Sequence, residues 1–482
     1  MSMNAGNVNP RDTSAPEADD LRDAVVVGGG FTGLTAALEL AERGHRVTVV
    51  EREPELGGLA GSFDVGDGRR IERFYHHWFD SDREMFDLCE RLGVPDALES
   101  HLTRTGMYYA NSIYRLSRPL DLLRFAPLPL LDRVRLGVLA LRGRRVTDWR
   151  TLEHRTAEEW LVSLGGRRVY DVVWRPLLEG KFGQYADQVG ATWMWTKLAL
   201  RGGSRTKSGS EILYYLRGGS EILVNALHKR LTELGVEVLA GTAVDAVTTD
   251  DAGVTGVRTE DGTFLPARQV LLTVAPELAA NLLSADGPDV PAHPALPALT
   301  RRLRDIRYLA NVCLVLENNR RLSDTYWLNV NDPSFPYVGV IEHTNMDSPS
   351  RYGNRHVVYL SKYLPADAEL YRMSDEEVFT YSLPYLRRMF PGFDRSWVED
   401  YHVWRAEYAQ PVITPNYSRD MPPTRTAVHG LYLASMAQVF PEDRGTNHAA
   451  REGRRSGQLM ADRLRTAGGP AAPRAEEEAS RA

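Results

Sequence analysis

The pattern of apolar and polar residues near the start of the chain predicts a strand, a helix and a second strand. Residues 24–27 are continuously apolar, as in a strand that is buried on both faces of a parallel sheet. Apolar residues then recur at helical spacing over 34–41, and residues 46–50 (RVTVV) predict a second strand. Gly44 lies between the two and ends the predicted helix. Residues 23–51 therefore form one predicted strand–helix–strand unit.

Two later segments predict more of the same architecture. Residues 216–276 are typical of a Gly-Gly turn, an amphipathic helix, a strand, a hairpin and a final buried strand. Residues 430–464 predict a short strand, a loop and a helix with one face of small residues. Together with the first unit, these segments predict an α/β fold.

The two segments in between differ from each other in pattern. Residues 80–215 are predicted to be helical. In contrast, residues 307–319, 337–345 and 356–364 alternate like strands, and we expect them to form an antiparallel sheet.

Composition places the chain among ordinary globular proteins. Its 482 residues, 43% hydrophobic and 25% charged, suffice for two or three domains that share a large interface. A net charge of −6 gives no indication of a nucleic acid partner. The two cysteines, Cys89 and Cys313, exclude a disulfide framework and a cysteine-based metal site, and they favour a reducing, cytoplasmic location.

The ends and the most apolar segment bear on contacts with membranes. Residues 1–21 lack the apolar core of a signal peptide, and we expect them and residues 467–482 to be disordered tails. No run of about eighteen apolar residues occurs, so a spanning helix is not expected. Residues 118–145 combine a leucine stripe with seven arginines. We interpret them first as a helix pair that covers a core, and second as a peripheral contact with a membrane surface.

The turn after the first predicted strand carries the pattern G-x-G-x-x-G. Gly28 permits a tight turn, Gly30 lets the backbone approach a pyrophosphate, and Gly33 lets the helix and strand pack closely. Phe31 and Thr32 complete the start of the helix, whose positive end suits a diphosphate. The turn therefore predicts a dinucleotide site.

An acidic residue and a second glycine loop extend this site. Glu51 closes the second strand, where a carboxylate can accept hydrogen bonds from both hydroxyls of an adenosine ribose. An acid at this position argues against a 2′-phosphate, and hence against NADP. Arg52 follows it, and Gly57, Gly58 and Leu59 begin a loop whose backbone can reach the same diphosphate.

With these motifs in this order, the chain resembles the FAD-dependent superfamily of amine oxidases, protoporphyrinogen oxidases and phytoene desaturases. The resemblance implies FAD as the cofactor, bound by a Rossmann-type domain of the glutathione-reductase kind, with an inserted α+β substrate domain. The FAD-binding domain would comprise 22–80, 216–300 and 426–466, and the substrate domain would comprise 81–215 and 301–425. No second G-x-G-x-x-G follows a strand. Electrons would therefore pass to oxygen, a quinone or another small acceptor rather than to a built-in NADPH site.

The resemblance also implies cofactor contacts outside the first unit. Val244 occupies the position whose backbone meets the adenine in the family. Thr446 or Asn447 can cap the helix whose N-terminus faces the pyrimidine edge of the flavin. Relatives place an aspartate directly after the preceding strand, whereas this chain has Ser-Met there. Asp443, later in the same loop, is the candidate substitute.

The stretch RFYHHWF, residues 73–79, places two histidines among four aromatic residues. In the arrangement of the family it runs back toward the isoalloxazine ring. Neighbours on an extended segment point to opposite sides, so only one of His76 and His77 can face the flavin. Either can be a structural, hydrogen-bonded residue or a general base near neutral pH. Because they point apart they make a poor joint metal site, and no metal is predicted.

Further candidates lie in the two insertions. Lys181 belongs to a segment that resembles the family's region lining the approach to the active site, and His343 belongs to the predicted sheet. With His76 and His77 they are the candidate catalytic residues. A wider set that can face the pocket, each weighed against a core or surface role, is Tyr185, Trp193, Trp195, Lys197, Tyr359, Lys362, Tyr363, Tyr408 and Gln410.

These observations favour a flavoenzyme that removes a hydride from a C–H bond, by desaturation or by amine or alcohol oxidation. The substrate is a small molecule that can be apolar, or linked to a lipid or a sugar. The alternative is a redox-neutral isomerase that resembles UDP-galactopyranose mutase or carotene isomerase. A non-enzymatic nucleotide-binding protein is the third interpretation.

Overall fold

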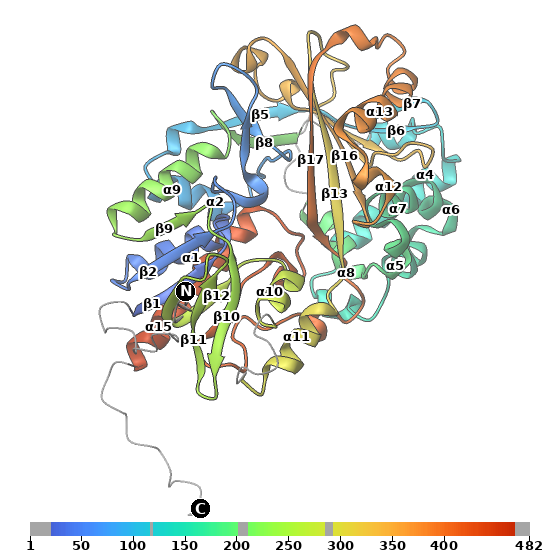
Figure 1. The fold of residues 1–482 in the computed structure, drawn as a ribbon. Coiled ribbons are helices and arrows are strands. Elements are labelled where there is room, and N and C mark those ends of the chain that lie inside the picture. The colour runs from blue at the N-terminus through green and yellow to red at the C-terminus, as the bar shows by residue number, and fades with distance from the viewer. Residues whose placement is uncertain (1–20, 116–118, 201–210, 285–292, 468–482) are drawn as a thin grey trace, which may run out of the picture.

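The computed structural model describes residues 21–115, 119–200, 211–284 and 293–467. Except for Leu21 and Ala467, the two expected tails lie outside these residues, as does Arg118 of the leucine–arginine segment. Within the described residues, the chain forms two seven-stranded sheets that stand side by side (Figure 1). The predicted α/β class is confirmed.

The first sheet contains the predicted N-terminal unit. Its strands run in the order β10-β11-β12-β1-β2-β9, and β18 pairs with β12. The parallel strands are β1 (Arg22–Val27), β2 (Val47–Glu51), β9 (Glu237–Ala240), the second half of β12 (Phe264–Leu272) and β18 (Leu431–Leu433). An antiparallel hairpin, β10 (Val244–Asp250) and β11 (Gly253–Thr259), adds to the first half of β12. The predicted order of elements over 216–276 and 430–464 is thus confirmed.

Successive residues of β1 serve opposite faces of this sheet. Ala24 and Val26 pack with α1 (Phe31–Ala41), α9 (Glu221–Glu233) and α15 (Thr446–Ala467). Val25 and Val27 pack with α10 (Pro276–Leu282) and α11 (Leu296–Arg304). Since both faces are covered, the strand has to be apolar throughout, which explains the continuous run in the sequence.

Glycines let α15 lie directly against α1. A Cβ atom on Gly453 would be 2.0 Å from Oγ1 of Thr35 and 2.2 Å from the carbonyl oxygen of Thr32. A Cβ atom on Gly457 would be 2.7 Å from the carbonyl oxygen of Ala36. The small-residue face of the C-terminal helix therefore covers the helix that follows the glycine turn.

The second sheet contains the predicted alternating strands. Its order is β17-β13-β16-β15-β14-β6-β7, and each neighbouring pair is antiparallel except β14 and β6. The strands are β6 (Thr105–Tyr109), β7 (Ser112–Tyr114), β13 (Tyr308–Asn318), β14 (Trp327–Val330), β15 (Gly339–Glu342), β16 (His356–Leu364) and β17 (Val398–Pro411). The strands predicted within 307–319, 337–345 and 356–364 are confirmed.

The prediction that 80–215 is wholly helical is wrong at two places. Residues 105–114 form the hairpin β6–β7, whose turn places Ala110 and Asn111 at φ of 48° and 58°. Such a turn joins antiparallel strands, and Asn tolerates its positive φ. In addition, β5 (Leu98–Thr103) pairs with β8 (Glu211–Leu216). β-Branched and aromatic residues are frequent in β6, β7 and β8, and this composition could have revealed the strands.

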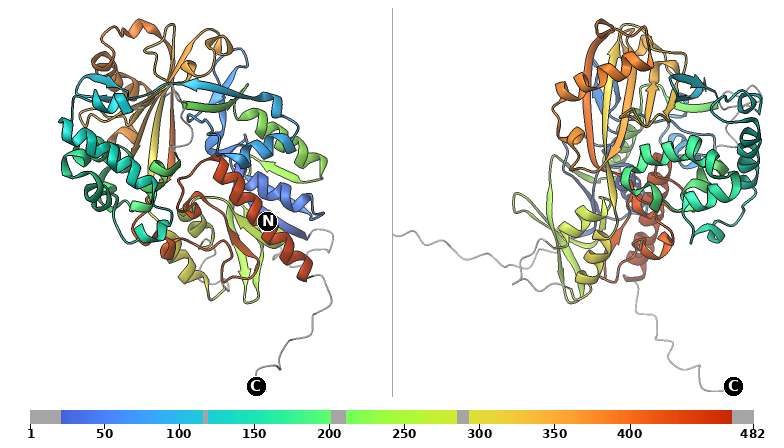
Figure 2. Two further views of the ribbon diagram at one scale, coloured as in Figure 1. Left: turned by 180° about the vertical axis from the view of Figure 1, so that it is seen from behind. Right: turned by 90° about the vertical axis from the view of Figure 1, so that its right-hand side faces the viewer.

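The helices between residues 119 and 200 gather on one flank of the molecule (Figure 2). They are α3 (Pro119–Leu123), α4 (Leu130–Arg144), α5 (Ala157–Gly165), α6 (Arg167–Val169), α7 (Arg175–Phe182) and α8 (Ala191–Leu200). The other helices are α2 (Arg83–Arg91), α12 (Glu369–Arg372), α13 (Asp375–Met389) and α14 (Tyr417–Asp420), and a short hairpin joins β3 (Ser62–Asp64) to β4 (Arg70–Glu72). Among the described residues, no helix is both long and apolar enough to cross a bilayer.

Candidate active site

The turn between β1 and α1 is built from the three predicted glycines. Gly28 has a φ of +114°, which residues with side chains rarely adopt. A Cβ atom on Gly33 would be 1.9 Å from the carbonyl oxygen of Gly28. At Gly30 the nearest atom to an added Cβ is Cα of Gly58, 3.9 Å away. The geometry of the turn therefore disfavours a side chain at Gly28 and at Gly33, whereas free space remains beside Gly30, where a ligand can approach the backbone.

The start of α1 suits an anion. Gly30 is the N-cap residue and provides no capping side chain, while Phe31 and Thr32 are buried in the first turn. The first N–H groups of a helix have no partner within it, and they attract negative charge. The residues that resemble a dinucleotide turn thus form a cradle that fits a diphosphate.

Glu51 lies at the tip of β2 beside this turn. Its Oε2 accepts a hydrogen bond from the N–H of Gly29 at 2.6 Å, and its Oε1 accepts one from the N–H of Glu53 at 2.8 Å. Arg52 is exposed and pairs with Glu53 at 3.3 Å. The N–H of Thr242 donates to the carbonyl of Glu51 at 2.9 Å. This bond brings the start of β10, at Val244, to the same end of the sheet.

The Gly-Gly loop runs directly against the glycine turn. Gly57 and Gly58 have φ values of 112° and 58°, and the N–H of Gly57 donates to the carbonyl of Gly29 at 2.9 Å. A Cβ on Gly58 would lie 3.2 Å from Cα of Gly30. The two glycine loops therefore present adjacent backbones, as expected for a shared diphosphate site.

A small cavity of about 60 Å³ lies between Leu59, the residue after this glycine pair, and the second sheet. Leu59 and the segment with His76 line one side, and strands of the second sheet line the other. Its lining residues are Leu59, Phe74, Tyr75, His76, Asn311, Ser361, Tyr363, Ala406, Ala409 and Arg444. Through Leu59, the cavity thus adjoins the Gly57-Gly58 loop.

The two adjacent histidines have different surroundings. His76 lines the cavity, and its Nδ1 lies 2.6 Å from the carbonyl oxygen of Phe74. The Nδ1 of His77 lies 2.9 Å from the hydroxyl of Tyr326, and its ring packs edge-on against Trp327. Burial lowers the pKa of His76 below its ordinary value, although the charge of Glu72 opposes this shift. His76 is therefore neutral near pH 7.

Asp443 joins two helices of the first insertion to the loop before α15. Its Oδ2 lies 3.2 Å from Nζ of Lys181 on α7 and 2.5 Å from Nζ of Lys197 on α8. Its Oδ1 accepts a hydrogen bond from Nε2 of Gln410 at 3.1 Å. Burial alone would raise the pKa of Asp443, but the two lysines and Arg444 outweigh it and hold the pKa well below its usual value. The carboxylate is ionised throughout the neutral range.

Arg444 connects this cluster to the cavity. Its Nη2 donates to the hydroxyl of Tyr363 at 2.6 Å, and its Nε donates to Oε1 of Gln410 at 3.2 Å. Lys181 and Lys197 thus pair with the carboxylate of Asp443, and Arg444 places a third cation close enough to lower the pKa of that carboxyl group.

The start of α15 is bound to the RFYHHWF segment and to α2. Oγ1 of Thr446 accepts a hydrogen bond from the indole of Trp78 at 2.7 Å, and Oδ1 of Asn447 accepts one from the N–H of Met85 at 3.3 Å. The two side chains predicted to cap this helix therefore hold its N-terminus beside the segment that contains His76.

Comparisons with known proteins agree with this geometry. The model of the family described as flavin containing amine oxidoreductase matches residues 31–460. The chain belongs to this family. It is accordingly a member of a family of flavin-dependent oxidoreductases.

Curated members of the family resemble parts of this oxidoreductase. The zeta-carotene desaturase of Zea mays is 27% identical over 234 residues, which are 44% of this chain and 40% of the desaturase. The coproporphyrinogen III oxidase of Propionibacterium freudenreichii subsp. freudenreichii is 26% identical over 355 residues, 62% of this chain and 64% of that enzyme. The chain thus spans less than two thirds of either relative.

A solved structure shows the shared fold over nearly the whole chain. Reduced UDP-galactopyranose mutase superposes with a TM-score of 0.68 at 15% identity, covering 92% of this oxidoreductase and 95% of the mutase.

Several of the predicted residues of the oxidoreductase lie outside the cavity lining. Nε2 of His343 lies 2.9 Å from the hydroxyl of Tyr352 in a buried aromatic cluster, where Tyr359 donates to the carbonyl of Glu72 at 2.8 Å. Trp193 is buried in the core of the helical flank, and Trp195 donates to the carbonyl of Val146 at 3.0 Å. Three more lie outside the lining. Tyr185 stacks with Arg307, and Tyr408 packs edge-on against Tyr308. Lys362 is partly buried, and this burial lowers its pKa.

Among the polar residues that line the cavity, sequence reasoning missed four: Tyr75, Asn311, Ser361 and Arg444. Nδ2 of Asn311 donates to Oγ of Ser361 at 2.9 Å, and Oδ1 of Asn311 is buried with no hydrogen-bond partner among the described residues. Asn311 and Ser361 are polar residues within otherwise apolar strands. That interruption was a readable signal, because a buried polar side chain needs a partner.

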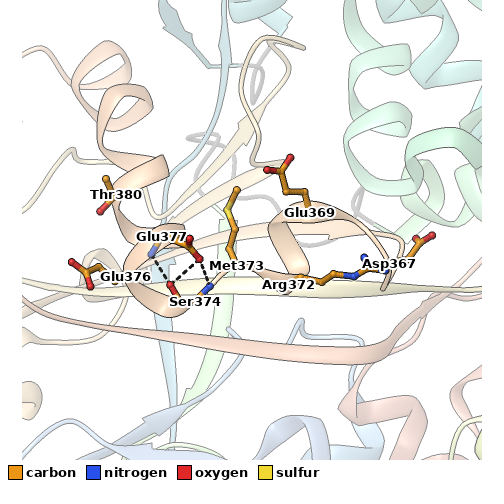
Figure 3. Close-up of a pocket in the computed structure, with 8 residues that line it drawn as sticks. All are labelled: Asp367, Glu369, Arg372, Met373, Ser374, Glu376, Glu377 and Thr380. Atoms are coloured by element: carbon orange, nitrogen blue, oxygen red, sulfur yellow. Dashed lines mark hydrogen bonds between the residues drawn. The ribbon is translucent and has the colours of Figure 1, made fainter.

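Two other features of the oxidoreductase lie away from the cavity. An open hollow of about 900 Å³ is formed by α12 and α13, and it contains the capping bonds between Ser374 and Glu377 (Figure 3). It shares no residue with the cavity beside His76. Ligand atoms of Glu317, Asp400 and His402 lie within 4.8 Å of one another. Arg355 already pairs with Glu317, and a cation there disfavours a metal ion.

Proposed function

We propose that the protein binds FAD and oxidises a small molecule that occupies the cavity beside His76. The glycine cradle supports a diphosphate, and Glu51 at the tip of β2 supports an adenosine ribose, which FMN lacks. When bound, FAD would supply the group that accepts a hydride from carbon. The observation that carries the proposal is that Leu59, which directly follows Gly57-Gly58, lines the same cavity as His76.

The residues around the cavity support oxidation of a carbon that bears an amine or a hydroxyl. Neutral His76 can accept the proton of such a group as hydride leaves its carbon. Oδ1 of Asn311, which lines the cavity, can accept a hydrogen bond from an N–H or O–H donor of the substrate. The apolar walls at Leu59, Ala406 and Ala409 would exclude water and hold the carbon skeleton.

The experiment begins with the purified protein and its released cofactor. We expect FAD rather than FMN, since only FAD uses the ribose site at Glu51. Oxidised protein is then mixed without oxygen with primary amines, secondary alcohols and polyenes. Loss of the yellow absorbance with one class, restored by oxygen or a quinone, would identify the substrate and the acceptor. Protein that cannot be loaded with FAD would refute the proposal.

A redox-neutral isomerase is the alternative that one observation favours. Lys181 and Lys197 pair with Asp443, and Arg444 lines the nearby cavity; a group of cations of this kind suits a phosphate-bearing substrate like the UDP-sugar of the mutase with the same fold. For this function we expect no bleaching by any substrate, and turnover only after reduction with dithionite, without net use of an acceptor.

A further inference from the structure

Helix α4 is apolar on two opposite faces. One face, with Leu136, Leu139 and Gly143, is buried against α5, α6 and α8 in the core of the helical flank. The other face is exposed over the whole length of the helix. We call it the exposed stripe, and it consists of Leu130 (68% exposed), Leu131 (62%), Val134 (55%), Val138 (36%) and Leu141 (60%). These positions recur every three or four residues and therefore form one continuous surface.

The stripe continues onto the neighbouring helix. Leu123 at the end of α3 is 50% exposed, and α3 packs against α4. Figure 1 shows α4 at the outer edge of the molecule, on the side away from α1, α9 and β2. Single exposed leucines are common on proteins, but a contiguous apolar surface of this length usually marks an interaction site.

Arginines border the stripe on both sides. At helical spacing, Arg135 and Arg142 lie along one margin, and Arg133 and Arg144 lie along the other. Arg124 and Arg145 extend this border at the two ends and are exposed. The one acid of α4, Asp132, is buried and pairs with Arg135 and Arg168. The surface is therefore an apolar centre within a positive rim.

We propose that this surface binds the face of a bilayer that contains anionic lipids. In such a contact the leucines and valines enter the boundary between headgroups and acyl chains, and the arginines meet the headgroup phosphates. A second copy of the chain is a poorer occupant. A two-fold contact would bring each positive rim against its own copy, and like charges would oppose the association.

The surface is one helix away from the candidate active site. Gly143 of α4 packs against Leu198 of α8, and a Cβ there would lie 2.8 Å from Cδ1 of that leucine. The same helix α8 presents Lys197 to Asp443. Docking through α4 would thus hold the active site close to the lipid surface. The proposed contact does not depend on which reaction the site catalyses.

The test is co-sedimentation of the full chain, loaded with its flavin, with vesicles of phosphatidylcholine, with and without phosphatidylglycerol. We expect binding to the mixed vesicles that weakens as salt is added, and weak binding to pure phosphatidylcholine. The variant Leu131→Ser/Leu141→Ser should bind roughly tenfold or more weakly, because two leucine side chains leave the lipid. The matched control is Leu102→Ser/Ile113→Ser. Leu102 and Ile113 are also exposed aliphatic side chains, at 70% and 42%, but they lie on β5 and β7 and not on the helical flank.

A charge variant separates the two parts of the contact. Arg142→Gln/Arg145→Gln should lose binding to phosphatidylglycerol vesicles and leave the weak binding to phosphatidylcholine unchanged. Retained flavin and an unchanged melting temperature would show that each variant is folded. Equal binding by the stripe variant and its control, or no binding to the mixed vesicles, would overturn the proposal. So would a dimer in light scattering that Leu131→Ser/Leu141→Ser converts to a monomer, since a second copy would then be the occupant.

Discussion

Nζ of Lys197 lies 2.5 Å from Oδ2 of Asp443, although 246 residues separate the two in the sequence. Lys181 shares the same carboxylate. The loop before α15 is thereby fixed to α7 and α8, so the helical flank and the nucleotide-binding half of the molecule meet at one buried charge cluster.

Replacing Asp443 with asparagine should destabilise the fold. The variant leaves two partly buried ammonium groups without their carboxylate, which we expect to lower the free energy of unfolding by about 2–3 kcal/mol. Urea unfolding of the variant and the wild type at neutral pH measures this difference. Glu53→Gln, at an exposed carboxylate paired with Arg52, is the control and should change it by less than about 0.5 kcal/mol.

The same pair of proteins gives a prediction for pH. The folded-state pKa of Asp443 is depressed, so its stabilising contribution is complete above the unfolded pKa, near ~4, and is lost as pH falls through the folded pKa. The stability gap between wild type and Asp443→Asn should therefore stay constant from neutral pH to about pH 4 and close below it. If the stability difference between the two proteins already narrows between pH 7 and pH 5, groups other than Asp443 cause that difference.

The glycine turn predicts two different results for two similar substitutions. In Gly30→Ala the new Cβ has 3.9 Å of space, so the protein should fold with unchanged stability and yet lose most of its affinity for flavin. In Gly33→Ala the Cβ would lie 1.9 Å from a backbone oxygen, so both stability and affinity should fall. Thermal melting without cofactor and flavin titration measure the two effects separately. Normal flavin affinity in Gly30→Ala would place the diphosphate elsewhere.

Substitutions of the two adjacent histidines should have different effects on kcat. His76→Gln is expected to lower kcat by roughly 100-fold or more, since a general base typically contributes this much. His77→Gln should reduce kcat only a few-fold and instead lower stability, because His77 contacts Tyr326 and Trp327. In the wild type, the acid limb of kcat/KM should lie below pH ~6.5, since burial lowers the pKa of His76. If His77→Gln were the slower variant, the assignment of the base would be wrong.

Close packing of α15 on α1 predicts the effect of a single methyl group. Gly453→Ala would place Cβ 2.0 Å from Thr35 and should cost about 1–3 kcal/mol of stability through overpacking. Because α1 carries the glycine cradle, flavin affinity should fall as well. Gly445→Ala, where no other atom lies within 4 Å of the added Cβ, is the control and should melt like the wild type.

The sequence predicted those features that depend on neighbours along the chain. The strand–turn–helix with Gly28, Gly30 and Gly33 could be recognised because each glycine meets a local constraint of the turn. The hairpin at Ala110 and Asn111 was also local, and it was overlooked within a segment interpreted as helical.

The partners of the site residues could not be predicted in this way. His77 contacts Tyr326, which lies 249 positions later in the sequence. Lys181 likewise contacts Asp443, which lies 262 positions later. Such contacts depend on how the two sheets and the helical flank come together. The sequence predicts Asp443 as a cofactor ligand by resemblance, whereas in the structure its carboxylate binds two lysines and a glutamine of the other half.

The contact between α1 and α15 has a consequence for synthesis on the ribosome. Thr35 donates a hydrogen bond to the carbonyl of Ala450, 415 residues later. If the ribosome adds about 5–20 residues per second, roughly 20–80 seconds pass between the synthesis of α1 and that of α15, the helix that covers its apolar face. During that interval the nascent N-terminal unit exposes apolar surface, and we expect the nucleotide cradle to become rigid only after the residues of α15 have emerged.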